Sequence, residues 1–343
     1  MEIAILGLPQ SGKSTLFEIM TGIASRERFG EPTVRGLARV PDTSFDELVN
    51  IFAPRKISPA AVPFMDLNAA GDDPWAQLRK LAGAADGIVH VVDGFTKTSE
   101  DEMAARYHKL SDELVISDLA IIEHKIERLA KIQKTHLKPE DVLHASLLPR
   151  LKEALEAGKA LRNLEMTDED LKSLRGFAFW TMKPELIVLN THEEAESIAE
   201  SFAARTKCTS PVIDISCQIE MEISHLPAVE RAAFLEGMGI SEPAFERIIK
   251  TAFKLLGRIW YYTVGEDEVK AWVIPAGWAA PKAAAAIHKD FERGFIKAEV
   301  VSYDDFMSSG KSIAAAKAAG KLRLEGKEYI VEDCDIISFR FNV

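Results

Sequence analysis

The sequence is poor in cysteine and contains no long apolar run. Its 343 residues include three cysteines, Cys208, Cys217 and Cys334, whose spacing fits neither a zinc-binding nor a dithiol redox motif. We therefore expect reduced thiols and a cytoplasmic location, which the lack of an export signal before the first apolar run supports. The apolar stretches are far shorter than the roughly 20 residues of a membrane-spanning helix, so no membrane association is predicted.

Positive charge is also in deficit. The chain carries 42 Lys and Arg against 53 Asp and Glu, a formal net charge of −11. Binding to a phosphate backbone depends on Lys and Arg displacing counterions, so we expect no sequence-specific DNA binding, and any RNA contact must be local. With 47% hydrophobic residues, the chain is long enough for two or three domains with buried cores.

Short apolar runs in the first 215 residues predict the strands of one sheet. Helical patterns such as Lys13–Met20, Trp75–Ala82 and Glu194–Arg205 separate several of them. This alternation is typical of an α/β fold with a doubly wound, mostly parallel sheet. The apolar runs are Ile3–Leu6, Val62–Met65, Gly87–Val92, Leu186–Leu189 and Val212–Ile215.

A long helical pattern at residues 98–176 interrupts this alternation and looks like an insertion. One helix of it carries apolar residues at heptad spacing, and a second helix supplies leucines to face them. The seam consists of Val115, Leu119, Ile122, Ile126 and Leu129, faced by Leu148, Leu151 and Leu155. The pattern predicts a helical hairpin.

The chain changes character after residue 257, where β-branched and aromatic runs predict a separate small domain. A helical pattern, Pro281–Arg293, lies among these runs and favours a mixed sheet packed on one helix. The predicted strands are Trp260–Val264, Val269–Ile274, Ala298–Ser302, Tyr329–Val331 and Ile336–Phe341.

The segment Gly7-Leu8-Pro9-Gln10-Ser11-Gly12-Lys13-Ser14 fits the P-loop pattern G-x-x-x-x-G-K-S, between an apolar strand and a helical pattern. Its glycines let backbone N–H groups point at phosphates, and the helix N-terminus adds positive potential. Lys13 would reach the β- and γ-phosphates as the catalytic cation, and the Ser14 hydroxyl would bind Mg²⁺. The expected phosphate contacts come from Gly7, Pro9, Gln10, Ser11, Gly12, Lys13, Ser14 and Thr15. Hydrolysis of ATP or GTP is the predicted chemistry, and a metabolic kinase is an alternative.

Several segments are similar to those of one known family. They are Gly12-Lys13-Ser14-Thr15-Leu16-Phe17, Lys270–Pro275, His288–Ile296, Gly326–Val331 and Phe339–Val343. On these residues the chain resembles the YchF or Obg-like ATPase family. The resemblance implies a P-loop NTPase G domain at residues 1–97 and 177–257, an inserted helical hairpin at 98–176 and a β-grasp TGS domain at 258–343. It also implies a slow Mg²⁺-dependent NTPase that acts as a switch near the ribosome or translation machinery.

The resemblance points to a base-binding motif at Asn190-Thr191-His192-Glu193. Members of the family carry Asn-x-x-Glu where most GTPases carry Asn-Lys-x-Asp. The longer carboxylate of Glu193 and the missing Lys weaken pairing with guanine, so ATP is expected first and GTP second. Ser216 and Cys217 correspond to a segment beside the base, where only backbone contacts carry over. The alternative is that Asn190 caps the following helix.

The two switch segments depart from the family pattern. Asp66 matches the aspartate that holds Mg²⁺ through water, but the glycine expected close behind it is displaced to Gly71. In the first switch Phe29 replaces the expected threonine, so Thr33 is a substitute Mg²⁺ ligand or, alternatively, a turn residue after Pro32. The glutamine that orients water in Ras-like enzymes is also absent, so slow turnover is expected. The rival hypothesis is a nucleotide-binding regulatory module that does not hydrolyse and recruits a protein or RNA through its TGS and helical domains.

Overall fold

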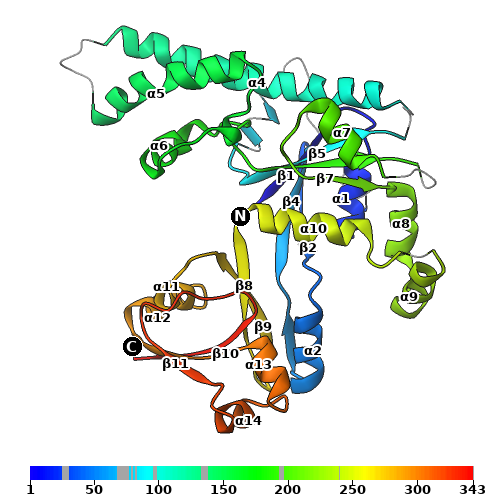
Figure 1. The fold of residues 1–343 in the computed structure, drawn as a ribbon, viewed down its shortest axis with the longest axis vertical. Coiled ribbons are helices and arrows are strands. Elements are labelled where there is room, and N and C mark those ends of the chain that lie inside the picture. The colour runs from blue at the N-terminus through cyan, green and yellow to red at the C-terminus, as the bar shows by residue number, and fades with distance from the viewer. Residues whose placement is uncertain are drawn as a thin grey trace. The chain divides into compact units, whose positions relative to one another are not determined.

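The structure, a computed structural model, describes residues 1–24, 31–67, 77–78, 80–81, 83–95, 99–132, 138–192, 197–238 and 240–342. The chain divides into two compact units. The first consists of Met1–Leu37 and Pro63–Ile248, and the second of Ala38–Val62 and Ile249–Val343. Each contains a six-stranded sheet (Figure 1).

The sheet of the first unit has the strand order β2-β4-β1-β5-β6-β7. Its strands are β1 (Ile3–Gly7), β2 (Thr33–Arg39), β4 (Ala61–Leu67), β5 (Gly87–Asp93), β6 (Glu185–Asn190) and β7 (Val212–Ile215). Strand β1 pairs in parallel with β4 and β5, and β6 pairs in parallel with β5 and β7. The five predicted strands and the mostly parallel sheet are confirmed. Strand β2 was not predicted, because its residues alternate between buried and exposed and form no apolar run.

The described helices of the first unit include α1 (Lys13–Thr21), α4 (Glu100–Ala130), α5 (Pro139–Glu156), α6 (Asp168–Leu174), α7 (Ala199–Thr206), α8 (Cys217–His225) and α9 (Ala228–Gly237), with the short helices η3 (Leu161–Asn163) and η4 (Arg175–Phe177). Helix α10 (Ala244–Leu255) begins in the first unit and ends in the second. Half of the predicted helix Trp75–Ala82 is described, and these residues, Gln77, Leu78, Lys80 and Leu81, are all helical. Helix α7 occupies the C-terminal part of the predicted helix Glu194–Arg205.

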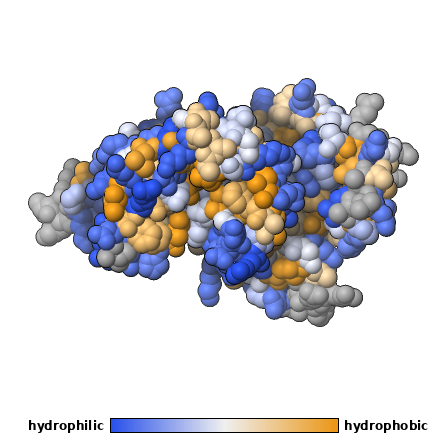
Figure 2. All heavy atoms as spheres, turned by 90° about the horizontal axis from the view of Figure 1, so that it is seen from below, coloured by the Kyte–Doolittle hydropathy of each residue, from blue (hydrophilic) through white to orange (hydrophobic). Residues whose placement is uncertain are grey.

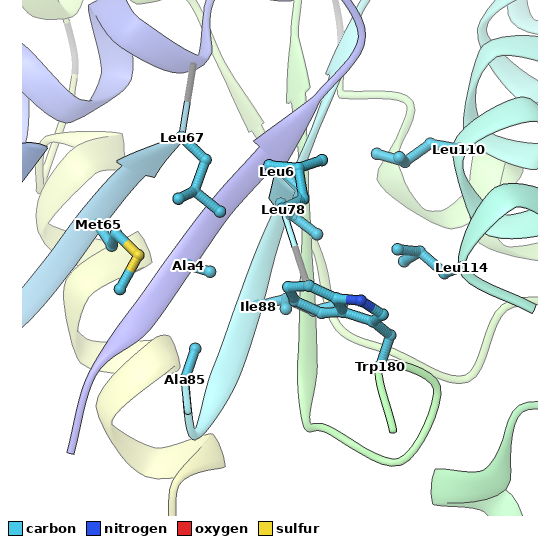
Figure 3. Close-up of a cluster of buried hydrophobic side chains, with 10 residues drawn as sticks. All are labelled: Ala4, Leu6, Met65, Leu67, Leu78, Ala85, Ile88, Leu110, Leu114 and Trp180. Carbon is cyan, nitrogen blue, oxygen red and sulfur yellow. The ribbon is translucent and has the colours of Figure 1, made fainter. Parts of the chain in front are cut away.

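One buried cluster joins the sheet to helix α4 (Figure 3). Strand β1 supplies Ala4 and Leu6, while α4 supplies Leu110 and Leu114. Trp180 lies among these side chains. The first half of α4 therefore belongs to the core under the sheet.

The second half of α4 forms the predicted hairpin with α5 (Figure 1). All eight residues of the predicted seam lie in one apolar cluster, with Ile122 and Leu129 buried and Val115, Leu119 and Ile126 partly buried against Leu148, Leu151 and Leu155. Ion pairs flank the seam: Lys125 Nζ is 2.8 Å from Asp141 Oδ1, and Lys152 Nζ is 2.7 Å from Glu123 Oε1. The heptad prediction is confirmed.

The second unit contains a mixed sheet, as predicted, with the strand order β11-β10-β12-β8-β9-β3. Its strands are β3 (Lys56–Ser58), β8 (Arg258–Thr263), β9 (Glu268–Pro275), β10 (Phe295–Ser302), β11 (Arg323–Glu325) and β12 (Asp335–Phe341). Strands β12 and β8 pair in parallel, whereas β8 pairs antiparallel with β9 and β10 pairs antiparallel with β12. The helices are α2 (Thr43–Phe52), α11 (Ala280–Ala284), α12 (Lys289–Arg293), α13 (Tyr303–Ser308) and α14 (Ile313–Ala318).

Two local predictions for this unit were wrong. The helix expected at Pro281–Arg293 is broken into α11 and α12, because His288 adopts an extended conformation and caps α12 by accepting a hydrogen bond from Asp290 N. The strand expected at Tyr329–Val331 is reduced to a single bridge between Ala279 and Ile330. Strand β11 takes the edge position beside β10 instead.

Residues 38–62, which the sequence-based division assigned to the G domain, belong to the second unit. The reason is packing against residues that are distant in the sequence. Phe45 and Leu48 of α2 are fully buried, and Phe45 lies against Tyr262 of β8. Strand β3 pairs in parallel with β9.

The surface in Figure 2 is a mosaic of hydrophilic and apolar side chains. Exposed large apolar residues include Leu37, Ile116 and Val142, which come from different elements. Within the described part of the chain, no helix combines the length and apolarity needed to cross a membrane.

Candidate functional site: the loop between β1 and α1

The loop between β1 and α1 has an unusual backbone. Gln10 and Gly12 both have positive φ, 66° and 91°, and Ser11 N donates to Leu8 O at 3.2 Å. In a tight turn, left-handed residues placed between right-handed ones direct successive N–H groups to the same side. These N–H groups then line a concave site that can bind an anion. A non-glycine residue in this region costs about 1 kcal/mol or more, and such strain is found preferentially at functional sites.

The two motif glycines are required by close contacts. A Cβ on Gly7 would lie 2.3 Å from Ser11 Oγ and 2.8 Å from Val91 O. A Cβ on Gly12 would lie 2.5 Å from Asn190 Nδ2. Since real Cβ atoms do not approach so closely, the loop closes on itself and on β6 only with glycine at both positions.

Lys13, Ser14 and Thr15 begin α1 and are partly exposed. The first turn of this helix holds no acidic residue, and Gly12 caps it without a side chain. The N–H groups of the first turn and the positive end of the helix dipole therefore face the loop without a carboxylate to neutralise them. This arrangement suits a phosphate group.

Asn190, at the end of β6, ties the loop to a second helix. Its Nδ2 donates to Ser11 O at 3.2 Å, and its Oδ1 accepts from Cys217 N, the first residue of α8, at 3.1 Å. The residue is 8% exposed. Among the described residues, the helix that follows Asn190 is α7, which begins at Ala199 and has Ile198 at its cap, so Asn190 does not cap this helix.

Ser216 and Cys217 lie at the start of α8. The Ser216 hydroxyl is buried and has no hydrogen-bond partner among the described residues. Cys217 is buried, and its Sγ lies 3.7 Å from the position of a Cβ on Gly12. Burial raises the pKa of Cys217 to about 12, so the thiol stays neutral at physiological pH. Glu193, the last predicted base-binding residue, lies outside the described residues.

The two remaining predicted metal ligands come from β4 and β2. Asp66 is fully buried near the end of β4, in register with Ile5 of β1. Thr33 begins β2, and its Oγ1 is buried with no partner among the described residues. Val40 N donates to Ala60 O, which joins the end of β2 to the start of β4, so Thr33 lies at the carboxyl end of β4.

The donor set fits Mg²⁺. Ser14, Thr33 and Asp66 offer only oxygen atoms, and Mg²⁺ commonly takes one or two protein oxygens together with phosphate oxygens and water. No group of three His, Cys, Asp or Glu side chains suited to a metal occurs in the described part of the chain. A metal held here would therefore need the phosphates as partners.

Sequence reasoning missed a pair of rings at the same edge of the sheet. Phe95 follows β5, is 41% exposed, and has its ring centroid 4.7 Å from that of His192, which follows β6. Phe95 N donates to Asp93 Oδ1, and Asp93 is in register with Asn190. The available signal was a large aromatic residue directly after a buried strand, since ligands of such sheets bind at the carboxyl ends of the strands.

A cavity of about 310 Å³ lies at the opposite edge of the sheet, where β6 begins. In its wall, Glu185 accepts hydrogen bonds from Arg162 Nη1 and Ser210 Oγ, both at 2.9 Å, and its Oε1 is 3.3 Å from His90 Nδ1. Burial raises the pKa of Glu185, but the hydrogen bond with His90 and the charge of Arg162 outweigh it and lower the pKa to about 2. This hydrogen-bonded ionic cluster is separate from the loop Gly7–Ser14, hereafter the phosphate loop.

The parallel sheet, the glycine-dependent loop after β1 and the helix that follows define the P-loop class of α/β nucleotide-binding folds. Comparisons with known proteins narrow the class. A family model described as "YchF-GTPase_C: Protein of unknown function (DUF933)" matches residues 259–342. The structure of the Schizosaccharomyces pombe YchF GTPase superposes with a TM-score of 0.86 at 24% identity, covering 99% of this chain and 97% of that one.

Curated relatives match the chain along its length. The "Ribosome-binding ATPase YchF" of Bacillus subtilis is 36% identical, covering 99% of this chain and 98% of the relative. That of Escherichia coli O157:H7 is 33% identical with the same coverage, and the "Obg-like ATPase 1" of rice (Oryza sativa subsp. indica) is 34% identical, covering 100% and 92%. The chain belongs to the YchF and Obg-like ATPase family.

Proposed function

We propose that this protein is a cytoplasmic, Mg²⁺-dependent ATPase that acts as a regulatory switch associated with the ribosome. Relatives over 30% identical along the chain are named ribosome-binding or Obg-like ATPases, which supports both the activity and the partner. GTP is the second candidate nucleotide. In this proposal residues 258–343 form a β-grasp TGS domain that, with the helical hairpin, contacts the partner.

The observation that carries the proposal is the loop from Gly7 to Ser14. Its positive φ angles at Gln10 and Gly12, and the close approach of Gly12 to Asn190, are conditions under which backbone N–H groups can surround a polyphosphate. Lys13 would contact the β- and γ-phosphates, and the other predicted phosphate contacts come from the same loop and the first turn of α1. Mg²⁺ bound with the phosphates would neutralise charge that develops during hydrolysis.

The base would bind where Asn190, Ser216 and Cys217 meet, with Glu193 as the discriminating carboxylate. Asn190 already uses one hydrogen atom of its amide on Ser11 O and one lone pair on Cys217 N, which leaves one of each for a base. Phe95 and His192 would supply an apolar face. An aromatic face accepts adenine or guanine alike, so the preference for ATP would depend on Glu193.

Turnover should be slow. Catalysis of phosphoryl transfer is mostly positioning and electrostatics, and the segment Leu67–Asp73 directly after Asp66 contains no glutamine to orient the attacking water. The segment that contains the displaced Gly71 lies outside the described residues.

The test is a phosphate-release assay with ATP and with GTP, beside a direct titration of each nucleotide with Mg²⁺. We expect saturable binding, tighter for ATP, and slow release of phosphate that the Lys13→Ala variant abolishes. Binding without turnover in the wild-type protein would select the rival, a non-hydrolysing regulatory module. No binding of either nucleotide would overturn the proposal. Transfer of phosphate to a small acceptor, with no release to water, would identify a kinase.

A further inference from the structure

Residues 38–62, hereafter the bridging segment, connect the two strands that carry the proposed metal ligands. Strand β2 begins at Thr33 in the first unit and ends in the second, and β4 begins in the second unit and reaches Asp66 in the first. Everything between them, including α2 and β3, packs into the second unit. Strands β2 and β4, hereafter the switch strands, are therefore both connected to the bridging segment, which packs outside the nucleotide-binding unit.

Apolar packing holds α2 in the second unit. Phe45 and Leu48 are fully buried, and the Phe45 ring lies 6.1 Å from that of Tyr262 on β8. At the end of α2, the Phe52 ring stacks on Phe306 of α13 with a centroid separation of 5.8 Å. Two buried side chains and a stacked pair fix the helix along its length.

Hydrogen bonds fix the same helix at its start. Asp42 caps α2 by accepting from Phe45 N at its Oδ1, and its other oxygen accepts from the Tyr262 hydroxyl at 2.7 Å. One turn later, Glu47 accepts from the Tyr303 hydroxyl at 2.8 Å. The two tyrosines belong to β8 and α13, so both polar contacts join the bridging segment to the body of the second unit.

The segment also completes the sheet of the second unit. Strand β3 forms the edge beside β9, with Lys56 in register with Glu268. Arg55 N and Lys56 N donate to the carbonyls of Glu266 and Asp267, both at 3.0 Å. Glu268 is 2.8 Å from Lys56 Nζ and accepts from Ser58 Oγ at 2.7 Å. A displacement of β3 would therefore break a row of bonds rather than one.

The opposite ends of the switch strands are placed to respond to a nucleotide. Thr33 Oγ1 is buried without a partner among the described residues, and Asp66 is fully buried beside β1. A hydrogen-bonded strand is stiff along its length, so a shift of Thr33 or Asp66 toward a metal moves the whole strand rather than one side chain.

We propose that the bridging segment couples nucleotide binding to the second unit: engagement of a Mg²⁺–triphosphate by Thr33 and Asp66 changes how α2 and β3 are held against β8, β9 and α13. This inference rests on the proposed nucleotide site. Because coupling between two sites is reciprocal, whatever binds the second unit at these elements changes the affinity for the nucleotide by the same factor. The device would let a partner of the second unit bias the nucleotide state without touching the phosphates.

Hydrogen exchange of the full chain tests the coupling. The amides of Arg55 and Lys56 are compared without nucleotide, with ADP and Mg²⁺, and with a non-hydrolysable ATP analogue and Mg²⁺. We expect their exchange rates to differ at least fivefold between the two nucleotide states, the lower end of typical coupling energies. The amides of Ala280 and Val331, bonded to Tyr329 O and Trp278 O in the same unit, serve as the control and should not change.

A variant provides the second readout. Tyr262→Phe combined with Tyr303→Phe removes both hydroxyl contacts to the bridging segment and keeps the rings. The ratio of the two nucleotides' dissociation constants should shift at least fivefold in this variant. Arg340→Gln, which breaks an ion pair with Glu299 elsewhere on the same sheet, should leave the ratio unchanged.

The outcomes separate the two proposals. If both nucleotides bind but neither the exchange rates of Arg55 and Lys56 nor the ratio of affinities changes, the coupling is overturned and the nucleotide site stands. If neither nucleotide binds the wild-type protein, the proposed function fails and the coupling fails with it.

Discussion

The amide group of Asn190 joins the backbone of Ser11 to the backbone of Cys217, so one side chain at the end of β6 holds both the phosphate loop and the start of α8. A residue expected to read the base thus has a structural duty as well. The two roles are compatible, because an amide offers two donors and two acceptor positions.

Replacing Asn190 with Ala should impair both stability and binding. The change leaves Cys217 N and Ser11 O without their partner, and an unsatisfied buried group costs about 1–3 kcal/mol. We expect the free energy of unfolding, measured by urea titration, to fall by about 2 kcal/mol. Nucleotide affinity should fall at least tenfold, because the same two hydrogen bonds hold the loop in place. Asn163→Ala, which removes only an exposed hydrogen bond with Thr209, is the control and should change neither. Unaltered ATP affinity in the Asn190 variant would contradict its role in the loop.

Gly12→Ala should abolish nucleotide binding. Its Cβ would collide with Asn190 Nδ2, and the residue has a φ of 91°. Gly158→Ala is a matched control, since Gly158 has a φ of 73° and nothing within 4 Å of its Cβ position. Both variants should lose about 1–2 kcal/mol from backbone strain. Only Gly12→Ala should fail to bind ATP by calorimetry. If both variants lost the same amount of ATP affinity, backbone strain alone would explain the loss.

Phe95→Ala should weaken the binding of ATP. Stacking of a base on an aromatic ring contributes about 1–3 kcal/mol, so we expect the dissociation constant to rise about 5- to 150-fold with little effect on thermal stability. Phe95→Tyr should restore the affinity, because it keeps the ring. Ile116→Ala, an exposed apolar residue on α4, is the control. Should Phe95→Ala bind ATP like the wild type, the ring pair has no part in base binding.

Glu185 should make the protein sensitive to acid. Its pKa is lowered from 4.5 to about 2 in the folded chain. The stabilisation it provides is therefore fully present above about pH 4.5 and is lost as the pH falls toward 2, a change of about 3 kcal/mol. Urea unfolding between pH 5 and pH 2.5 should show this slope, and Glu185→Gln should flatten it at a cost in stability at neutral pH. The exposed Glu200→Gln should retain the wild-type slope.

Much of the first unit could be predicted from the sequence. Strands such as Gly87–Asp93 and Glu185–Asn190 are buried along their whole length, and a short run dominated by apolar residues predicts a strand of this kind. The seam of the hairpin could be predicted equally well, because a heptad pattern predicts both a helix and the face of the helix that is buried. The phosphate loop could be located because its pattern requires glycine at fixed positions.

The remaining features depend on contacts distant in the sequence. Residues 38–62 belong to the second unit although their neighbours in the sequence belong to the first. Phe45 packs against Tyr262, more than 200 residues away, and no local sequence pattern predicts that contact. The double use of Asn190 and the pairing of Phe95 with His192 have the same origin. Each joins residues that come together only where parallel strands end side by side.

Helix α4 spans 31 residues, about 46 Å, and has two different apolar faces along its length. Leu110 and Leu114 are part of the sheet's core, while Ile122 and Leu129 belong to the seam with α5. The hairpin consequently cannot be removed as an independent unit. A deletion that starts within α4 either uncovers apolar residues of the sheet or leaves seam residues of α4 without the α5 side chains that they pack against.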